Sequence, residues 1–151
     1  MSQKIFSFSS ALMSLVVALT AAACSMKNVD DAALAESSLV GNSWYVEYIH
    51  ERPVIDRSPA YFLFDKNGTL RGNASCNQFV GKYELSHGQV TLSELATTRR
   101  VCIESLGEQE RRFLSAVSDV AKWKIERGLL LLLSARGEIV FQSATHARAK
   151  N

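Results

Sequence analysis

Cysteine and histidine are the residue types in this chain best suited to nucleophilic, redox or metal chemistry. The three cysteines, Cys24, Cys76 and Cys102, are too few for a structural zinc site built from cysteines alone. The histidines are scattered, and none has metal-ligand spacing: His50, His87 and His146. No histidine lies near Cys76 or Cys102 in the sequence, so neither has an adjacent base that would favour a reactive thiol. We expect no metal site and no catalytic cysteine.

Other catalytic patterns are also missing from the sequence. There is no glycine-rich phosphate loop, no G-x-S-x-G nucleophile elbow and no carboxylate pair with a plausible shared site. Two arginine pairs, Arg99–Arg100 and Arg111–Arg112, could bind phosphate-rich lipid headgroups, but they are more typical of a solvated face. We therefore expect a protein that is not an enzyme and needs no cofactor.

The N-terminus has the features of an export signal. Lys4 precedes an apolar run over residues 11–19, and small residues lead to Cys24. A membrane-spanning helix is the less favoured reading, because residues 5–23 are barely long enough and contain several serines. Residues 21–24, Ala-Ala-Ala-Cys, resemble a bacterial lipobox, in which the cysteine is acylated, although Ala21 stands where leucine is common. The alternative is an ordinary A-x-A cleavage site that releases a soluble periplasmic protein.

These features divide the N-terminal region into two parts. Residues 1–23 are expected to be the signal peptide, and residues 24–38 the lipidated cysteine and a polar tether. Residues 29–34 could instead form a short helical turn that docks on the domain. Ser25, by resemblance to enterobacterial sorting, favours the outer membrane, with the domain facing the periplasm.

The export signal also bears on the two remaining cysteines. Cys76 and Cys102 would lie in an oxidising compartment, where a disulfide is the default. Two free buried thiols are the alternative.

Composition supports one ordinary folded domain after the signal. The chain has 151 residues, 47% of them hydrophobic and 21% charged, which are typical globular values. Its formal net charge of +2 is too small for a dedicated nucleic-acid binder.

Short strand-like runs alternate with turn residues from residue 39 onward. Asn67–Gly68 and Ser86–His87–Gly88 predict hairpin turns. Arg52–Pro53 and Ser58–Pro59 are expected to bracket a loop. Eight short strands are predicted, at residues 44–49, 61–64, 69–73, 79–85, 89–92, 123–127, 129–134 and 138–142.

One segment has helical spacing instead. A helix is predicted from about Ser105 to Lys122, with Ser105 and Glu108 as a capping box and with Phe113 and Val117 facing the sheet. Its charged residues are expected to lie largely toward solvent: Glu108, Glu110, Arg111, Arg112 and Asp119.

The run of leucines at residues 129–133 does not alternate, which favours a strand buried on both faces, one toward the interior and one toward the helix. The predicted fold is mainly β, a small antiparallel barrel or half-open barrel of about eight strands with one late inserted helix.

Residues 76–83, Cys-Asn-Gln-Phe-Val-Gly-Lys-Tyr, resemble the Cys-Asn-x-Phe-x-Gly-x-Tyr core of the META-domain family. Residues 98–102 are similar to its Thr-x-x-x-Cys element, and Glu110 with Phe113 to its helix. The resemblance covers about residues 39–142. Ser75 departs from it, because many members have glycine before the cysteine. The matching positions that we expect to be structural are Leu39, Gly41, Trp44, Asn77, Phe79, Gly81, Tyr83 and Thr98.

The resemblance implies a small, mostly β, barrel-like domain with one helix and two paired cysteine elements. It also implies a non-catalytic protein, since members are not known as enzymes, and HslJ-like members are associated with heat shock, envelope stress and novobiocin tolerance. Asn77 is expected to bond nearby backbone at a turn, and Gly81 to mark a bulge or a bend.

These interpretations lead to one functional hypothesis with two alternatives. Residues 39–143 would be the META domain and residues 144–151 a polar tail, on a lipoprotein that binds an envelope protein or an amphiphile. A carrier for a small apolar ligand is the first alternative, and it requires an empty interior. A pilotin-like secretion assembly factor is the second, and it requires an apolar groove at a seam. No nucleic-acid partner is expected, and the oligomeric state is left open.

Overall fold

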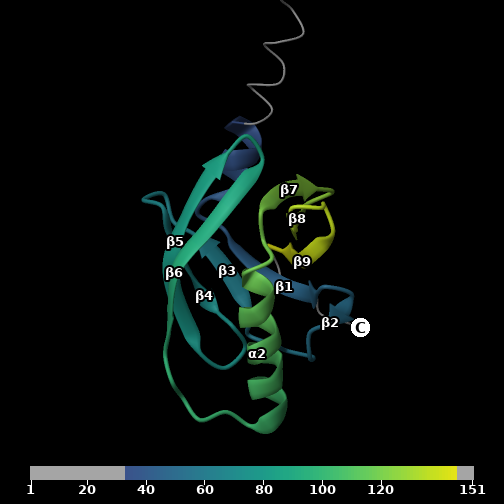
Figure 1. The fold of residues 1–151 in the computed structure, drawn as a ribbon. Coiled ribbons are helices and arrows are strands. Elements are labelled where there is room, and N and C mark those ends of the chain that lie inside the picture. The colour runs from purple at the N-terminus through teal and green to yellow at the C-terminus, as the bar shows by residue number, and fades with distance from the viewer. Residues whose placement is uncertain (1–32, 146–151) are drawn as a thin grey trace, which may run out of the picture.

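The computed structural model describes residues 33–145. Residues 33–39 are helical, so the expected boundary between tether and domain at residue 38 falls inside a helical segment. Among the described residues, no helix has the length and apolar character needed to span a membrane. The elements that follow are β1 Ser43–Ile49, β2 Arg52–Pro53, β3 Tyr61–Phe64, β4 Thr69–Asn73, β5 Gln78–Ser86, β6 Gln89–Thr97, α2 Glu104–Val117, β7 Lys122–Glu126, β8 Leu129–Leu133 and β9 Ile139–Ala144 (Figure 1).

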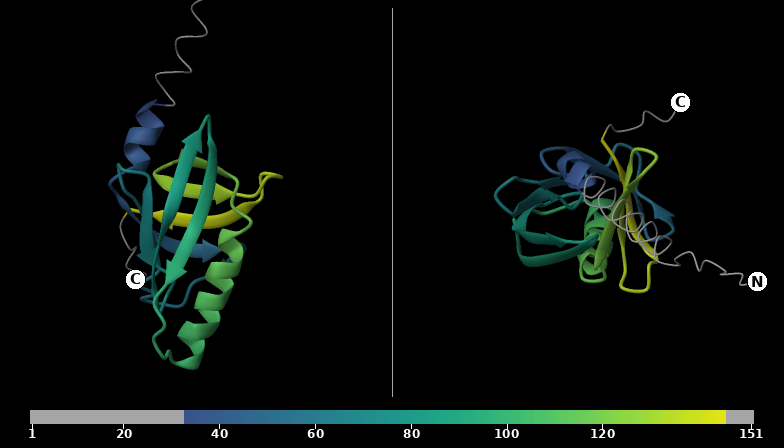
Figure 2. Two further views of the ribbon diagram at one scale, coloured as in Figure 1. Left: turned by 60° about the vertical axis from the view of Figure 1, so that its left-hand side comes forward. Right: turned by 90° about the horizontal axis from the view of Figure 1, so that it is seen from above.

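The described strands form one antiparallel, ring-like sheet. They follow each other in the order β2-β1-β3-β4-β5-β6-β7-β8-β9, and β1 also pairs with β9, which closes the ring (Figure 2). The predicted fold class is therefore confirmed. The ninth strand is β2, where the sequence predicted a loop: Arg52 and Pro53 pair with the end of β1. A two-residue strand is too short for side-chain alternation to reveal it.

The ring is joined most weakly between β6 and β7, a place that we call the β6–β7 seam. Gln89 and Lys122 are its one residue pair, with hydrogen bonds from Val90 N–H to Ala121 O at 3.0 Å and from Trp123 N–H to Gly88 O at 2.9 Å. The α2 helix is inserted in the chain between these two strands, and it stands between the β5–β6 hairpin and the β7–β9 strands (Figures 1 and 2). The late helix thus fills the side of the ring that the strands leave open.

Aromatic rings fill the centre of the molecule. The rings of Phe62, Phe113 and Phe141 are fully buried, and their centroids lie 4.9 to 5.0 Å apart. One comes from β3, one from α2 and one from β9, so the helix and two distant parts of the ring share a single core. Other large buried members are Trp44, Phe64, Leu70, Phe79, Tyr83, Trp123, Leu130 and Leu132.

The helix differs from its predicted limits at both ends. It begins at Glu104 after Ile103, and no side chain caps it, so Ser105 and Glu108 do not form the predicted capping box. It ends at Val117, and Lys122 already belongs to β7. Val120 is buried at helical spacing although it lies past the helix, because the connection to β7 continues over the same core. Periodicity therefore overestimated the length of the helix.

The leucine strand β8 is buried on both faces at its centre, as predicted. Leu130 and Leu132 are fully buried in the main core, and Leu131 is buried on the opposite face of the strand. The expected neighbour on that second face was wrong, however. The buried residues of α2, Phe113 and Val117, belong to the same core cluster as Leu130 and Leu132, so the helix lies on that face of β8 and not on the face of Leu131.

Candidate functional site

The disulfide joins the turn between β4 and β5 to the loop that precedes α2. Cys76 and Cys102 are bonded to each other, with their Cα atoms 6.1 Å apart and a sequence separation of 26 positions. Both cysteines are half-buried. The bond therefore ties the start of the helix to the strands, and the alternative of two free thiols does not describe this structure.

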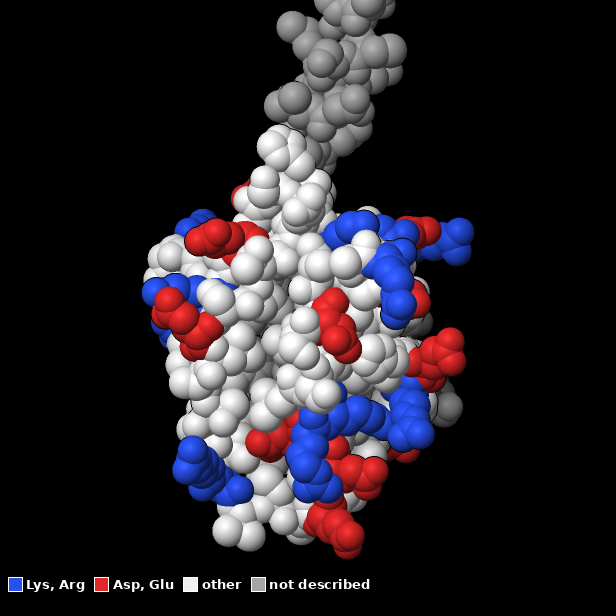
Figure 3. Space-filling model, in the orientation of Figure 1, with Lys and Arg blue, Asp and Glu red and all other residues white. Residues whose placement is uncertain are grey.

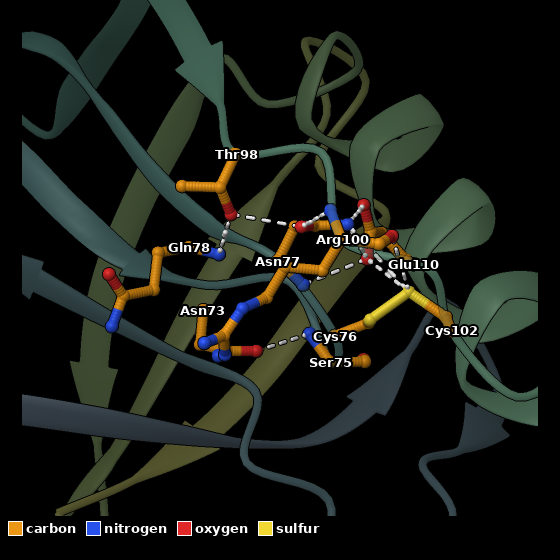
Figure 4. Close-up of a disulfide and its surroundings, with 9 residues drawn as sticks. All are labelled: Asn73, Ser75, Cys76, Asn77, Gln78, Thr98, Arg100, Cys102 and Glu110. Carbon is orange, nitrogen blue, oxygen red and sulfur yellow. Dashed lines mark hydrogen bonds between the residues drawn. A yellow bond between two sulfur atoms is a disulfide. The ribbon is translucent and has the colours of Figure 1, made fainter.

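Asn77 is the centre of a polar cluster beside the disulfide, which we call the Asn77 cluster (Figure 4). Its side chain is 5% exposed, and all of its polar atoms have partners. Its Nδ2 donates to Glu110 Oε1 at 2.9 Å, while its Oδ1 accepts from Thr98 Oγ1 at 2.9 Å and from Arg100 N–H at 2.7 Å. Its own backbone N–H donates to Glu110 Oε2 at 2.9 Å. One buried amide thus links the β4–β5 turn, the loop after β6 and α2.

The geometry of this cluster is that of a structural joint. Buried polar groups are costly unless they are hydrogen-bonded, and here every bond holds one element against another. The prediction that Asn77 bonds nearby backbone at a turn captures only part of this, because its main partner is the Glu110 side chain, 33 positions away. Glu110 was expected toward solvent, and that expectation was wrong: its half-buried carboxylate points at Asn77.

A second buried amide lies next to the first and was missed by sequence reasoning. Gln109 is 3% exposed. Its Nε2 donates to Ser58 Oγ at 2.6 Å and to Ser75 Oγ at 2.8 Å, and its Oε1 accepts from Ile55 N–H at 2.7 Å. We call these residues the Gln109 cluster. A polar residue one position before Glu110 on a helix carries no local pattern that marks it as buried.

Ser75, where the sequence departs from the family pattern, has a backbone φ of 110°. Glycine adopts this region freely, whereas a side chain is strained there. The serine is held by two hydrogen bonds, from its own N–H to Asn73 Oδ1 at 2.7 Å and from Gln109 Nε2 to its hydroxyl. The turn is therefore the one that glycine would favour, stabilised here by side-chain bonds.

Cys76, Cys102 and Glu110 also form a cluster of three potential metal-ligand atoms, all within 4.8 Å of one another. It is the one such cluster found among residues 33–145. Its two sulfurs are bonded to each other, and a metal site requires thiolates. In the oxidised form the three residues therefore offer a single carboxylate ligand.

Two open hollows lie on the surface. The larger, which we call the β1–β2 groove, has a volume of about 1090 Å³ and is lined by the β1–β2 hairpin, α2 and β9. The smaller has a volume of about 450 Å³ and lies on β3–β6 and the start of the following loop, beside Tyr61, Arg71 and Val80. Neither lies at the β6–β7 seam. The residues that line the larger hollow are Tyr48, Ile49, His50, Glu51, Arg52, Arg112, Glu138, Ile139 and Gln142.

Charged side chains of both signs are mixed over the surface. Figure 3 shows lysine and arginine next to aspartate and glutamate across one face, without a broad patch of one sign. Of the two arginine pairs, Arg99, Arg100 and Arg111 are exposed, whereas Arg112 is half-buried in the β1–β2 groove. The reading of a solvated face therefore holds for three of the four.

The described histidines stand apart from the Asn77 cluster. His87 is exposed in the β5–β6 turn, and His50 lies at the β1–β2 groove with its Nε2 3.7 Å from Asp119. His146 and Cys24 lie outside the described residues.

The model of the META domain matches residues 37–146 of this chain. The chain belongs to the META-domain family. A curated relative, the heat shock protein HslJ of Escherichia coli (strain K12), is 26% identical over 117 residues, which cover 76% of this chain and 83% of the relative.

Solved structures share the fold of this META domain. A solution structure of a protein from Burkholderia xenovorans superposes with a TM-score of 0.60 at 20% identity, covering 73% of this chain and 85% of that one. A crystal structure of a DUF4847 family protein from Bacteroides vulgatus has a TM-score of 0.57 at 13% identity, covering 74% and 96%.

The family motif of this META domain is built into its core and turns. Leu39, Trp44, Phe79 and Tyr83 are buried, while Asn77 and Thr98 meet in the Asn77 cluster. The Trp44 Nε1–H donates to Leu39 O at 2.9 Å, which joins the helical segment to β1. Tyr83 donates to Asp65 O at 2.6 Å; burial, with the nearby Glu36 and Asp65 carboxylates, raises the pKa of its hydroxyl.

The two motif glycines occupy positions that disfavour a side chain, Gly41 through its backbone conformation and Gly81 through lack of space. Gly41 has a φ of 83° as the chain enters β1. At Gly81 the β5–β6 register shifts, and an added Cβ would lie 2.8 Å from Ser93 O, so the predicted bulge is confirmed.

Proposed function

We propose that this META-domain protein is a non-catalytic lipoprotein of the outer membrane, with its domain facing the periplasm. A lipid on Cys24 holds it at the membrane, and the domain contributes to tolerance of heat, envelope stress and novobiocin-type antibiotics. It acts by binding a protein or an amphiphile on its outer surface, without transforming it.

Family membership and the export pattern support the first part of this proposal. The similarity to the heat shock protein HslJ connects the family with heat stress. The signal-like residues 1–23 and the lipobox-like residues 21–24 favour export and anchoring. A disulfide between Cys76 and Cys102 fits an oxidising compartment.

The observation that carries the choice of surface binding is the filled interior. Phe62, Phe113 and Phe141 are in contact at the centre of the ring and have no exposed surface. Carriers of small apolar molecules need an internal cavity of several hundred Å³. The two hollows described above are open to the outside, so the alternative of an internal carrier loses its support.

The pilotin-like alternative requires an apolar groove at a seam. Half-buried leucines lie on the two elements next to the β6–β7 seam, Leu92 and Leu95 on β6 and Leu114 on α2, but they pack against the core. The larger hollow is beside β1, β2 and β9. We therefore keep a single candidate function.

The test uses a strain that lacks the gene, complemented with the wild-type chain or with Cys24→Ala. We expect the wild type to restore survival after heat shock and in novobiocin, and Cys24→Ala to restore less, because the domain is no longer held at the membrane. Full survival without the protein would contradict the proposal.

A second measurement separates surface binding from internal carriage. Native mass spectrometry of the purified protein is expected to show no stoichiometric apolar ligand retained from the cell. A tightly held ligand that resists dilution would favour the carrier.

A further inference from the structure

The β1–β2 groove has the make-up of a ligand site that the proposed function does not yet assign. It is the larger of the two hollows, at about 1090 Å³, and its walls come from the β1–β2 hairpin, α2 and β9. Distant parts of the chain therefore meet in it, because Ile49 at the end of β1 and Ile139 at the start of β9 both line it. It is separate from the disulfide and from the Asn77 cluster, whose residues do not line it.

Arg112 is the under-satisfied group in this groove. Its side chain is half-buried, and its Nη2 donates to Pro53 O at 3.3 Å. Its Nε is fully buried and has no hydrogen-bond partner within residues 33–145, and no carboxylate there forms an ion pair with it. A guanidinium that lines an open hollow without a carboxylate partner among the described residues can donate to an anion that enters from outside.

The charged side chains around Arg112 have an excess of one positive charge. Arg52 and Arg112 line the groove together with Glu51 and Glu138. Glu138 is already paired with Arg136 at 3.3 Å, which leaves two arginines against one free carboxylate. A carboxylate carries one negative charge at neutral pH, whereas a phosphate monoester carries about −1.5 to −2. Charge complementarity therefore favours a carboxylate.

Apolar surface beside the arginines defines the rest of the ligand. Tyr48 is 37% exposed and Ile139 is 43% exposed, and both line the groove. His50, also at the groove, lies 3.7 Å from Asp119 and is thus partly neutralised when protonated. An apolar chain lying across Tyr48 and Ile139 would remove both side chains from water while its head group meets Arg112.

We propose that the β1–β2 groove binds a single-chain amphiphile with a carboxylate head, of the fatty-acid class. The carboxylate accepts from the Nη donors of Arg112, with Arg52 adding charge, and the chain packs on Tyr48 and Ile139. This deepens the proposed function, on which it rests, by naming the surface and the class of ligand.

The test measures binding to the purified full chain carrying Cys24→Ala, so that no acyl chain of its own is attached. Dodecanoate is titrated below its micelle concentration by calorimetry, beside dodecyl phosphate and dodecyltrimethylammonium. We expect dodecanoate to bind about tenfold more tightly than the cationic amphiphile, because a charge-assisted hydrogen bond is lost with the latter. Amide chemical shifts of the same protein should change in the β1–β2 hairpin and at the start of β9.

Two arginine variants make the test specific. Arg112→Gln should weaken dodecanoate binding by about tenfold, whereas Arg99→Gln, which removes the same charge from an exposed site outside the groove, should leave it unchanged. Thermal melting checks that each variant is folded; if Arg112→Gln is not, the milder Arg52→Gln takes its place. Equal effects of the groove variant and the control would overturn the proposal. So would chemical shifts confined to another face, or dodecyl phosphate binding as tightly as dodecanoate.

The outcomes separate this inference from the proposed function. Absence of dodecanoate binding, with stress survival still dependent on the protein, would overturn the inference alone. Binding as expected, with survival independent of the protein, would overturn the proposed function alone.

Discussion

Ser75 shows how one residue can hold a backbone conformation that its type disfavours. Its φ of 110° costs about 1–3 kcal/mol for a residue with a Cβ. Its hydroxyl repays part of this by accepting from Gln109, which is buried and needs an acceptor. The hydrogen bond of the serine hydroxyl to the buried Gln109 amide therefore offsets part of the cost of its strained backbone.

Two substitutions at Ser75 separate the strain from the hydrogen bond. Ser75→Ala and Ser75→Gly both remove the hydroxyl, but only glycine relieves the strain. We expect Ser75→Ala to lower the free energy of unfolding by about 1–3 kcal/mol, and Ser75→Gly to be more stable than Ser75→Ala by about 1 kcal/mol. Urea unfolding of the three proteins measures this. An alanine variant as stable as the glycine variant would show that the backbone is not strained there.

Asn77 and Glu110 can be tested as a pair. Asn77→Asp places a second carboxylate where the amide donated to Glu110 at 2.9 Å, and it should cost about 3 kcal/mol or more in the free energy of unfolding. The double variant Asn77→Asp/Glu110→Gln should recover part of the loss, because the new amide can donate to the new carboxylate. Urea unfolding of both single variants and the double variant completes the cycle. Strictly additive losses would mean that the two side chains are not coupled.

At the scale of elements, the helix α2 owes its place to three kinds of contact. The disulfide holds the loop before it, Gln109 and Glu110 bond to the turns around β3 to β5, and Phe113 enters the aromatic core. A helix without a side-chain cap, joined to a sheet whose seam beside it has one residue pair, depends on such tertiary contacts.

Removal of the disulfide should loosen α2 without unfolding the domain. Cys76→Ser/Cys102→Ser is expected to lower the free energy of unfolding by about 2–4 kcal/mol, the usual size for a loop of this length. Circular dichroism at low temperature should still show the native spectrum. Mass spectrometry of the unreduced wild type after alkylation is the direct check, and two alkylated thiols at these positions would refute the bond.

The apolar face of α2 has its own test. Val117 is 7% exposed, so Val117→Asp buries an unpaired carboxylate and should cost several kcal/mol, on the order of 3 or more. Ser115→Asp, an exposed position on the same helix, is the matched control and should change little. Thermal melting compares them. Equal melting temperatures for the two variants would mean that the Val117 face is not packed on the sheet.

At the scale of the whole molecule, the protein combines a ring-like sheet with an N-terminus expected to reach the membrane. Closure of β1 on β9 leaves the apolar interior filled, so we propose that other molecules bind on the outside. The helical residues 33–39 enter the domain through Leu39, which is fully buried. Membrane attachment would therefore be connected to the folded core by a short path along the chain.

The proposed anchoring depends on Cys24, which lies outside the described residues. Cys24→Ala is expected to abolish attachment, because acyl chains supply the membrane affinity of such a protein. Detergent phase separation of the mature protein measures it: the wild type should enter the detergent phase, and the variant should stay in the aqueous phase or remain unprocessed. Wild-type protein in the aqueous phase would favour cleavage at an ordinary A-x-A site.

Local patterns were sufficient for most of the strands and for the fold class. The hairpins at Asn67–Gly68 and His87–Gly88, the bulge at Gly81 and the strand at residues 61–64 all follow from short-range rules. Side chains of a strand point to alternate faces, and a tight turn needs particular residue types. Both features can therefore be recognised from residues that are neighbours in the sequence.

Contacts between distant positions were decided only by the tertiary structure. Examples are the burial of Gln109, the bond between Asn77 and Glu110 and the contact of Arg112 with the backbone of Pro53. The partners in these contacts are 33 to 59 positions apart in the sequence. Each of these side chains is polar, and polarity alone predicts exposure to solvent. Whether such a group finds a buried partner, or is left short of one, depends on which surfaces the closing ring brings together, and no local pattern in the chain records that.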